Sequence, residues 1–193
     1  MTLPPLILAS SSVYRQQQLS QLNIDFEAYS PDIDETPTAD EIPEELALRL
    51  AVSKAQKAHA EFTDAVVIGS DQVCSQGHLT YGKPGSKENA IAQLLKFVGK
   101  RVVFNTALAV IDPKGRQYHH VDRTVVKFRS LTRSEIEQYV QQDHPMECAG
   151  GFKVESLGLS LFESIKTTDP SALVGLPLIT TAQFLREVGY AIP

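Results

Sequence analysis

The sequence predicts an α/β fold. Short apolar runs, which suit buried strands, alternate with longer stretches in which apolar residues recur at helical spacing. Polar residues follow the first two apolar runs directly, and open α/β sheets usually bind their ligands at the carboxyl ends of such strands. The 193 residues suit one domain, or one domain split by a cleft.

The first element is a strand over Leu6–Ala9, followed by three serines and a helix in which Leu19 and Leu22 share a face. Hydroxyl groups and free N–H groups at the start of a helix form an anion site, because the helix dipole favours negative charge there. The same serines are also explained by a plain N-cap, and the sequence leaves both interpretations open.

Residues 30–43 form an acidic, proline-bearing loop that leads into a helix over Pro43–Ala60. Pro43 suits the first turn, and Glu44 and Glu45 lie at the positive end of the helix dipole. The apolar residues spaced for burial on one side are Leu46, Leu50 and Ala51.

A second buried strand is expected over Ala65–Ile68, ended by Gly69, Ser70 and Asp71. An aspartate directly after four apolar residues and a Gly-Ser turn is hard to explain by solvation alone. Asp71 is therefore a candidate functional carboxylate.

The second half of the chain contains a long β-hairpin between two helical segments, and a last helix near the end. The hairpin turn is indicated by Pro113 and Gly115 at positions that suit a type I turn, and the helix after it by Thr132 and Glu135, which are spaced as a capping box. The expected ranges are a helix over 86–99, strands over 102–111 and 117–128, and helices over 133–142 and 180–188.

Composition excludes several classes of protein. The net charge of -5 and the pI near 5.5 argue against a grip on long nucleic acids, which needs a basic surface. Cys74 and Cys148 are too few for a disulfide framework and are expected to be buried, reduced thiols. The first residues show no signal-peptide or membrane-span pattern, so we expect a cytoplasmic protein with no membrane partner.

Several common catalytic patterns are absent from the sequence. It contains no dinucleotide-binding glycine motif, no P-loop and no nucleophile elbow. The histidines have no zinc-site spacing, and the adjacent His119 and His120 point to opposite faces of a strand, which argues against a shared metal.

What remains is a set of short polar clusters at strand and helix ends. Carboxylates in two loops, with lysines and an arginine, are what a metal-assisted phosphate site requires, because hard divalent cations share oxygen ligands with phosphate. Each cluster also has a plain alternative, since Asp34 and Glu35 suit a solvated loop and Lys54 an exposed helix face. The clusters are Ser10–Arg15, Asp32–Glu35, Lys54, Asp71 with Gln72, and Lys83.

Six strings in order along nearly the whole chain resemble the Maf family of nucleoside triphosphate pyrophosphatases. They are residues 8–15 (LASSSVYR), 34–36 (DET), 49–55 (RLAVSKA), 69–73 (GSDQV), 82–84 (GKP) and 174–177 (VGLP). The strings GSDQVC and CAGGFK, at 69–74 and 148–153, are more similar to the branch that acts on 7-methylguanosine triphosphate than to the UTP and dTTP branch. One departure is Val13, where the family usually has proline.

The resemblance implies a fold, a reaction and partners. The fold would be an elongated mixed β-sheet flanked by helices, with two lobes and a central cleft, similar to inosine triphosphate pyrophosphatases, formed by residues 1–193 as one domain. The reaction would be hydrolysis of 7-methyl-GTP between its α and β phosphates, with a divalent metal cation such as Mg, Mn or Co. A homodimer is expected, with a small nucleoside triphosphate and no nucleic acid polymer as partner.

The resemblance also implies a role for each site residue. Asp71 would accept a proton from the attacking water and would hold the metal together with Glu35. The triphosphate would be bound by Ser10, Arg15, Lys54 and Lys83. Base selection would rest on Tyr14, Gln72 and Glu155, since an aromatic face and a carboxylate both suit a positively charged 7-methylguanine.

Other functions stay open. The chain could be a dTTP or UTP pyrophosphatase, or one of broad range for modified nucleotides. It could also be a nucleotide-binding regulator, because the family has been linked to arrest of septum formation. The presence of every implied catalytic group favours the enzyme.

Overall fold

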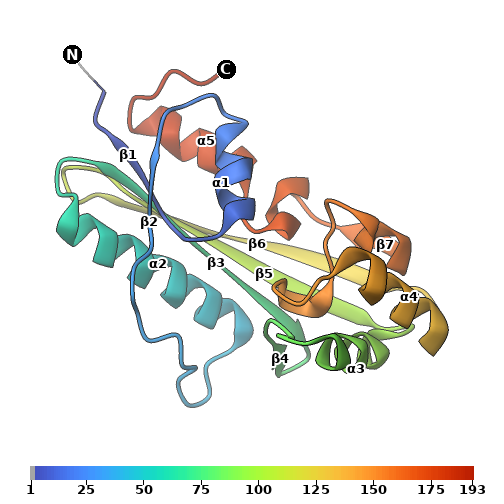
Figure 1. Ribbon diagram of the computed structural model, residues 1–193. Coiled ribbons are helices and arrows are strands. Elements are labelled where there is room, and N and C mark those ends of the chain that lie inside the picture. Colours follow the sequence, from blue (N-terminus) through green and yellow to red (C-terminus); the bar gives the residue numbers. More distant parts are fainter. Residues whose placement is uncertain (1–2) are drawn as a thin grey trace.

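The computed structural model describes residues 3–193 and has one seven-stranded sheet with helices on both faces (Figure 1). Three short 3-10 helices, η1 to η3, complete the secondary structure of this range. In chain order the elements are β1 Leu6–Ala9, α1 Val13–Ser20, β2 Glu27–Tyr29, α2 Pro43–Glu61, β3 Val66–Gln76, β4 Leu79–Tyr81, α3 Lys87–Phe97, β5 Arg101–Ile111, β6 Gln117–Phe128, α4 Arg133–Asp143, η1 Ala149–Gly151, η2 Leu157–Leu161, β7 Phe162–Lys166, η3 Pro170–Val174 and α5 Leu178–Glu187.

The sheet is mixed and elongated, as expected. Its order is β2-β1-β3-β5-β6-β7, and β4 pairs with the far end of β3. β1 is parallel to both of its neighbours, whereas all other pairs are antiparallel. β3, β5 and β6 have 11, 11 and 12 residues, so they run through the whole length of the molecule.

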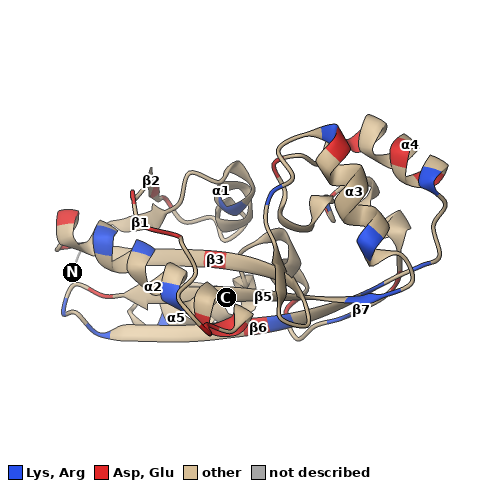
Figure 2. Cartoon of the chain, turned by 90° about the horizontal axis from the view of Figure 1, so that it is seen from below, with Lys and Arg blue, Asp and Glu red and all other residues tan. Residues whose placement is uncertain are grey.

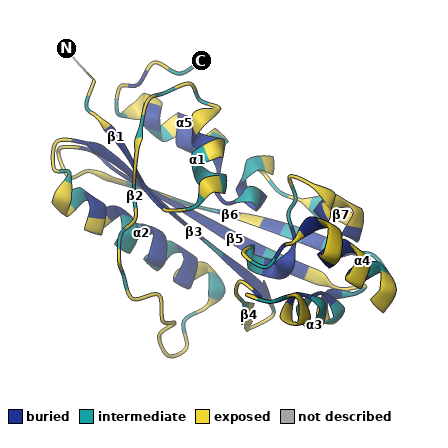
Figure 3. Cartoon of the chain, in the orientation of Figure 1, coloured by how far each residue is buried: buried dark blue, intermediate teal, exposed yellow. Residues whose placement is uncertain are grey.

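Three apolar cores divide the molecule into two ends. At one end α2 covers one face of the sheet, and α1 with α5 covers the other (Figure 1). At the other end α3 and α4 pack with the far parts of the long strands around an aromatic group, which comprises Phe97, Phe104, Phe128 and Phe152. Figure 3 shows the long strands as the buried centre that both ends share.

Most long elements begin and end close to the expected residues. α2 and the hairpin strands are confirmed, and the hairpin turn is closed by a hydrogen bond from the Gly115 N–H to the Asp112 carbonyl, 2.9 Å. The capping box of α4 is present, with Thr132 and Glu135 each binding the other's backbone N–H. The first helix is shorter than expected, because α1 ends at Ser20, before Leu22, although Leu19 and Leu22 do pack against the same core.

The main correction concerns the second strand. Gly69, Ser70 and Asp71 do not end it, since β3 continues through them to Gln76. Gly69 lies in a strand because α2 crosses directly over it: a Cβ atom there would lie 2.2 Å from the Ala51 carbonyl oxygen. The glycine thus marks a close approach of a helix and not a turn.

Three short strands were missed by sequence analysis. β2 and β4 have three residues each and β7 has five, too few for a clear alternating pattern. β4 does carry a signal, because Gly77 and His78 form a two-residue hairpin loop and Gly77 has a positive φ of 62°. Over residues 3–193 the structure has no helix long and apolar enough to cross a membrane.

The contact at Gly69 generates the first prediction. Gly69→Ala should lower the free energy of unfolding by about 3 kcal/mol, because the added methyl group meets backbone and side-chain atoms of α2 and forces the helix away from the sheet. Urea denaturation measures the change. Gly82→Ala is the control, since nothing lies within 4 Å of a Cβ atom there; equal stability of the two variants would contradict the packing argument.

Candidate functional site

The candidate site lies at a gap along one edge of β3. Pairing with β1 stops at Gly69, and pairing with β4 starts at Cys74. Between them, residues 70–73 pair with β5 on one side only. The gap leaves room for loops from both ends of the molecule, and it places Asp71 and Gln72 at their centre.

A cavity of about 720 Å³ occupies this gap. Its size lies within the usual range for small-molecule sites. One side is formed by the start of α1, the loop after β2, and α2, and the other side by the loop after β4 and by residues 147–155. The expected cleft between two lobes is therefore present.

Two carboxylates and a lysine meet inside the cavity. The Lys54 ammonium group lies 2.7 Å from Glu35 Oε1 and 2.5 Å from Asp71 Oδ1. The side chains of Lys54 and Asp71 are only 11% and 12% exposed, whereas that of Glu35 is 59% exposed. The side chain of Lys54 is thus largely enclosed, and Lys54 is not, as the alternative had it, an ordinary exposed helix residue.

The geometry of this cluster fits a divalent cation. Glu35 and Asp71 already converge on one positive charge, and both supply oxygen, the donor atom that magnesium and manganese prefer. Among the residues that the structure describes, no group of three or more His, Cys, Asp or Glu side chains is arranged so that it could hold a metal ion. A cation held by only two carboxylates keeps positions for substrate phosphate oxygens and water.

Arg15 belongs to α1 and lines the cavity, and a hydrogen bond holds its guanidinium group in place. Its Nε donates a hydrogen bond of 2.8 Å to the carbonyl of Gly175. Burial lowers the pKa of this guanidinium, and the charges of Asp71 and Glu35 act in the opposite direction. A partly buried arginine that lines a cavity is suited to binding an anionic ligand.

The serine segment combines the two roles considered for it. Ser12 is the N-cap of α1, with its Oγ accepting a bond from the Arg15 N–H, 3.4 Å. Ser10 is buried, and its Oγ accepts a bond of 3.1 Å from the Ser12 N–H. Both serines also line the cavity beside the start of the helix, where an anion is favoured. Val13 is the first helical residue, a position at which proline is common.

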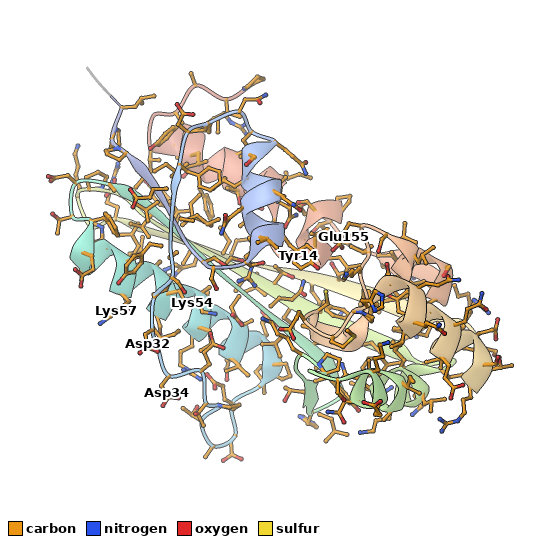
Figure 4. All side chains as sticks on the ribbon, viewed as in Figure 1. Tyr14, Asp32, Asp34, Lys54, Lys57 and Glu155 are labelled. Carbon is orange, nitrogen blue, oxygen red and sulfur yellow. The ribbon has the colours of Figure 1, made fainter. Side chains whose placement is uncertain are left out.

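The remaining predicted charges divide into two groups. Lys83 is exposed and lines the cavity from the loop between β4 and α3, opposite α2. Asp32 and Asp34 do not line it, and Figure 4 places both on the loop that passes in front of α2. Asp34 Oδ1 instead accepts a bond of 2.9 Å from the Thr36 N–H. Asp34 is therefore an exposed loop residue outside the cavity, as the alternative interpretation of the sequence had it.

The three residues expected to select the base all line the cavity. Tyr14 and Glu155 lie close to each other, where α1 faces the segment after η1 (Figure 4). Burial, and next the Cys148 thiol, raise the pKa of Tyr14 to about 12, so its hydroxyl stays protonated at neutral pH. The Gln72 amide nitrogen donates to Ala172 O and Leu173 O, at 3.0 and 3.1 Å.

Sequence analysis missed two residues of the site. Cys148 was expected to be buried like Cys74, but it is half-buried and lines the cavity, with its Sγ 3.8 Å from the Tyr14 hydroxyl. Gly175 was noted only as part of a motif, although its carbonyl accepts bonds from both Arg15 and Ser70. The sequence could have suggested only one property of this position, a positive φ, because glycine adopts such a conformation readily.

Figure 2 shows how charges are distributed over the rest of the chain. Lysine and arginine are interspersed with aspartate and glutamate along α2, α3 and α4, and do not gather on one face.

Comparison with known proteins shows similarity to one family over nearly the whole chain. The family described as Maf-like protein matches residues 5–188. A protein of Xanthomonas axonopodis pv. citri named 7-methyl-GTP pyrophosphatase is 48% identical over 99% of this chain and 100% of its own length. One of the same name from a Polaromonas species is 47% identical over 97% of this chain and 86% of its own.

Solved structures show a similar fold in more distant proteins. A HAM1 protein from Coxiella burnetii aligns with a TM-score of 0.52 at 16% identity, over 96% of this chain and 100% of that one. The Ham1 protein of Staphylococcus aureus aligns with a TM-score of 0.50 at 13% identity, over 95% of this chain and 98% of that one. At these identities the likeness concerns the fold alone.

The contact between Gly175 and Arg15 generates the second prediction. A Cβ atom on Gly175 would lie 3.3 Å from Arg15 Nε, and its φ of 132° is one that other residues rarely adopt. Gly175→Ala should therefore displace Arg15 and weaken binding of inorganic tripolyphosphate about tenfold, by the loss of one charge-assisted contact. Isothermal titration calorimetry measures the affinity.

A matched control separates this contact from backbone strain. Gly99 also has a positive φ, 65°, but nothing lies within 4 Å of a Cβ atom there. Gly99→Ala should keep the affinity for tripolyphosphate of the unchanged protein. If it weakens binding as much as Gly175→Ala does, the loss comes from strain and not from Arg15.

Proposed function

Because the chain belongs to the Maf family, we propose that it is a nucleoside triphosphate pyrophosphatase that hydrolyses 7-methyl-GTP to 7-methyl-GMP and diphosphate. The observation that carries the proposal is the convergence of Glu35, Lys54 and Asp71 in a cavity that also contains Tyr14 and Glu155. One part of this cavity suits a triphosphate with a metal, and the other suits a cationic purine. Relatives at 46–48% identity that bear this enzyme's name support the choice of substrate.

Asp71 is the group best placed to act on water. It is nearly buried on β3, and its ion pair with Lys54 uses Oδ1. We assign it the role of orienting the attacking water and accepting its proton. A bound divalent cation, held by Asp71 and Glu35, would lower the pKa of water and neutralise phosphate charge.

The cations of the cavity would bind the phosphate chain. Arg15 is fixed by Gly175, and Lys83 reaches the cavity from the opposite side. Lys54, now paired with two carboxylates, could turn to phosphate oxygens when those carboxylates hold a cation. Charge that develops on the leaving diphosphate is then stabilised by groups already in place, and no covalent enzyme intermediate is needed.

The other part of the cavity would select the base. A 7-methylated guanine carries a delocalised positive charge, which an aromatic face and a carboxylate both stabilise. Tyr14 would stack on the ring, and Glu155 would accept bonds from its N1–H and amino groups. The Gln72 amide nitrogen is bound to the carbonyls of η3, so this side chain would form a fixed part of the wall.

The cytoplasmic location and the homodimer stay predictions. So does the choice of magnesium, manganese or cobalt. A regulatory role in septum formation could coexist with hydrolysis, because both would use the same phosphate site.

The role of Asp71 can be tested by Asp71→Asn. The variant should keep its fold and lose turnover by about a hundredfold or more, because an amide cannot accept the proton. A coupled assay for diphosphate measures the rate. Asp34→Asn is the matched control, since that exposed carboxylate only binds a backbone N–H and an amide oxygen can replace it. Activity of Asp71→Asn within about threefold of the unchanged enzyme would remove Asp71 from this role.

The substrate can be tested with a panel of nucleotides. We expect 7-methyl-GTP to be hydrolysed faster than GTP, UTP and dTTP, and we expect EDTA to stop the reaction and magnesium, manganese or cobalt to restore it. Chromatography should show 7-methyl-GMP and diphosphate as products. A preference for UTP or dTTP would contradict the substrate, and no hydrolysis with any metal would favour a binding protein.

A further inference from the structure

Glu155 lies in a segment without regular secondary structure, yet α4 holds this segment at two points. The Tyr139 hydroxyl accepts a hydrogen bond of 3.0 Å from the Lys153 N–H. The Ser156 hydroxyl donates a short hydrogen bond to Asp143 Oδ1. The residues on either side of the pair Val154 and Glu155 are thus both tied to one helix.

The two holding residues form a rigid platform. Tyr139 and Asp143 are four residues apart on α4, so their side chains lie on the same face of the helix. They are 4% and 8% exposed. The helix itself is packed into the apolar core through Ile136 and Val140. Movement of the segment relative to the sheet is therefore restricted.

The segment is also closed on itself. The Lys153 carbonyl accepts bonds from the Ser156 N–H, 3.3 Å, and from the Gly158 N–H, 2.9 Å. A Cβ atom at Gly158 would lie 2.3 Å from the same carbonyl oxygen, so only glycine permits this closure. Together with the bonds to α4, the turn leaves the Glu155 backbone few alternatives.

One feature of the platform costs stability. Asp143 Oδ2 is buried and has no partner of ordinary hydrogen-bond geometry within residues 3–193, and Asp143 takes part in none of the ion pairs of this range. The Asp143 carboxylate does interact with the neighbouring Tyr139 hydroxyl, since burial and next this carboxylate raise the pKa of Tyr139. A buried carboxylate that is only partly satisfied is unfavourable for folding. Ser156 alone does not require an aspartate at position 143, because an amide oxygen or a water molecule could accept the same hydrogen bond from its hydroxyl group.

We propose that Tyr139 and Asp143 are positioning residues for base recognition: by holding Lys153 and Ser156 they keep Glu155 facing Tyr14 across the base site. This inference rests on the proposed function, since the ligand is the 7-methylated guanine of the substrate. Neither residue lines the cavity, so both act through the Lys153–Ser156 turn. The turn carries selectivity for the base, whereas Asp71 and the phosphate-binding cations carry turnover.

Kinetics of Ser156→Ala and Tyr139→Phe test the proposal. Each variant should lower the ratio of kcat/KM for 7-methyl-GTP to that for GTP by about threefold to tenfold, the range for residues coupled through contact. The change should appear mainly in KM for 7-methyl-GTP, because the groups that act on the phosphates are untouched. In a Glu155→Ala background the same substitutions should have no further effect on the ratio.

Thr132→Ala is the matched control. It removes the N-cap at the other end of α4 and should lower the Tm by about 2–4 °C without changing the ratio. The proposal is overturned if both variants keep the ratio of the unchanged enzyme, if they lower it equally in the Glu155→Ala background, or if Thr132→Ala lowers it as much.

The proposed function and the positioning role can fail separately. If the unchanged enzyme hydrolyses no triphosphate, or if it hydrolyses 7-methyl-GTP no better than GTP, the proposed substrate is wrong and the positioning role falls with it. If Glu155→Ala abolishes the preference but Ser156→Ala and Tyr139→Phe leave the ratio unchanged, only the positioning role is wrong.

Discussion

The site depends on one constraint, the gap along β3 between the end of β1 and the start of β4. A strand in the middle of a sheet normally has hydrogen-bonded neighbours on both sides. Residues 70–73 have a neighbour on one side only, because β1 turns away into the serine segment and β4 is a short hairpin strand. Loops from both ends of the molecule therefore reach the same stretch of strand, and their side chains surround it.

Close packing of α2 gives the gap its electrostatic character. Gly69 lets the helix approach the sheet so closely that the side chain of Lys54, one turn after Ala51, is largely enclosed beside Asp71. A largely buried lysine paired with two carboxylates is a preformed set of charges: the carboxylates could hold a cation in place of Lys54, and Lys54 could then pair with an anionic ligand. The net charge of -5 is compatible with such a ligand, because a few placed cations act locally while the average describes the whole surface.

The carbonyl groups of η3 and Gly175 hold several side chains at and beside the cavity in place. They accept bonds from Gln72, Arg15 and Ser70, residues of two other elements. The segment is itself held by Asp169, whose carboxylate accepts bonds from the backbone of Ser171 and Ile179. Phosphate-binding and base-facing side chains thus share one backbone support. The part of the cavity wall that contains Glu155 is held separately, by hydrogen bonds to α4.

The sequence by itself determined the α/β class and the long elements, and it singled out the residues that the structure brings together around one cavity. Apolar periodicity and capping residues act over a few positions, so they are readable in α2, α4 and the hairpin, while the three-residue strands β2 and β4 are too short to show a period. Only the tertiary structure decided that β3 continues through Asp71, that the Lys54 side chain is largely enclosed and that Asp34 is not part of the cavity. These outcomes depend on contacts between residues far apart in the chain, and no local pattern encodes such distances.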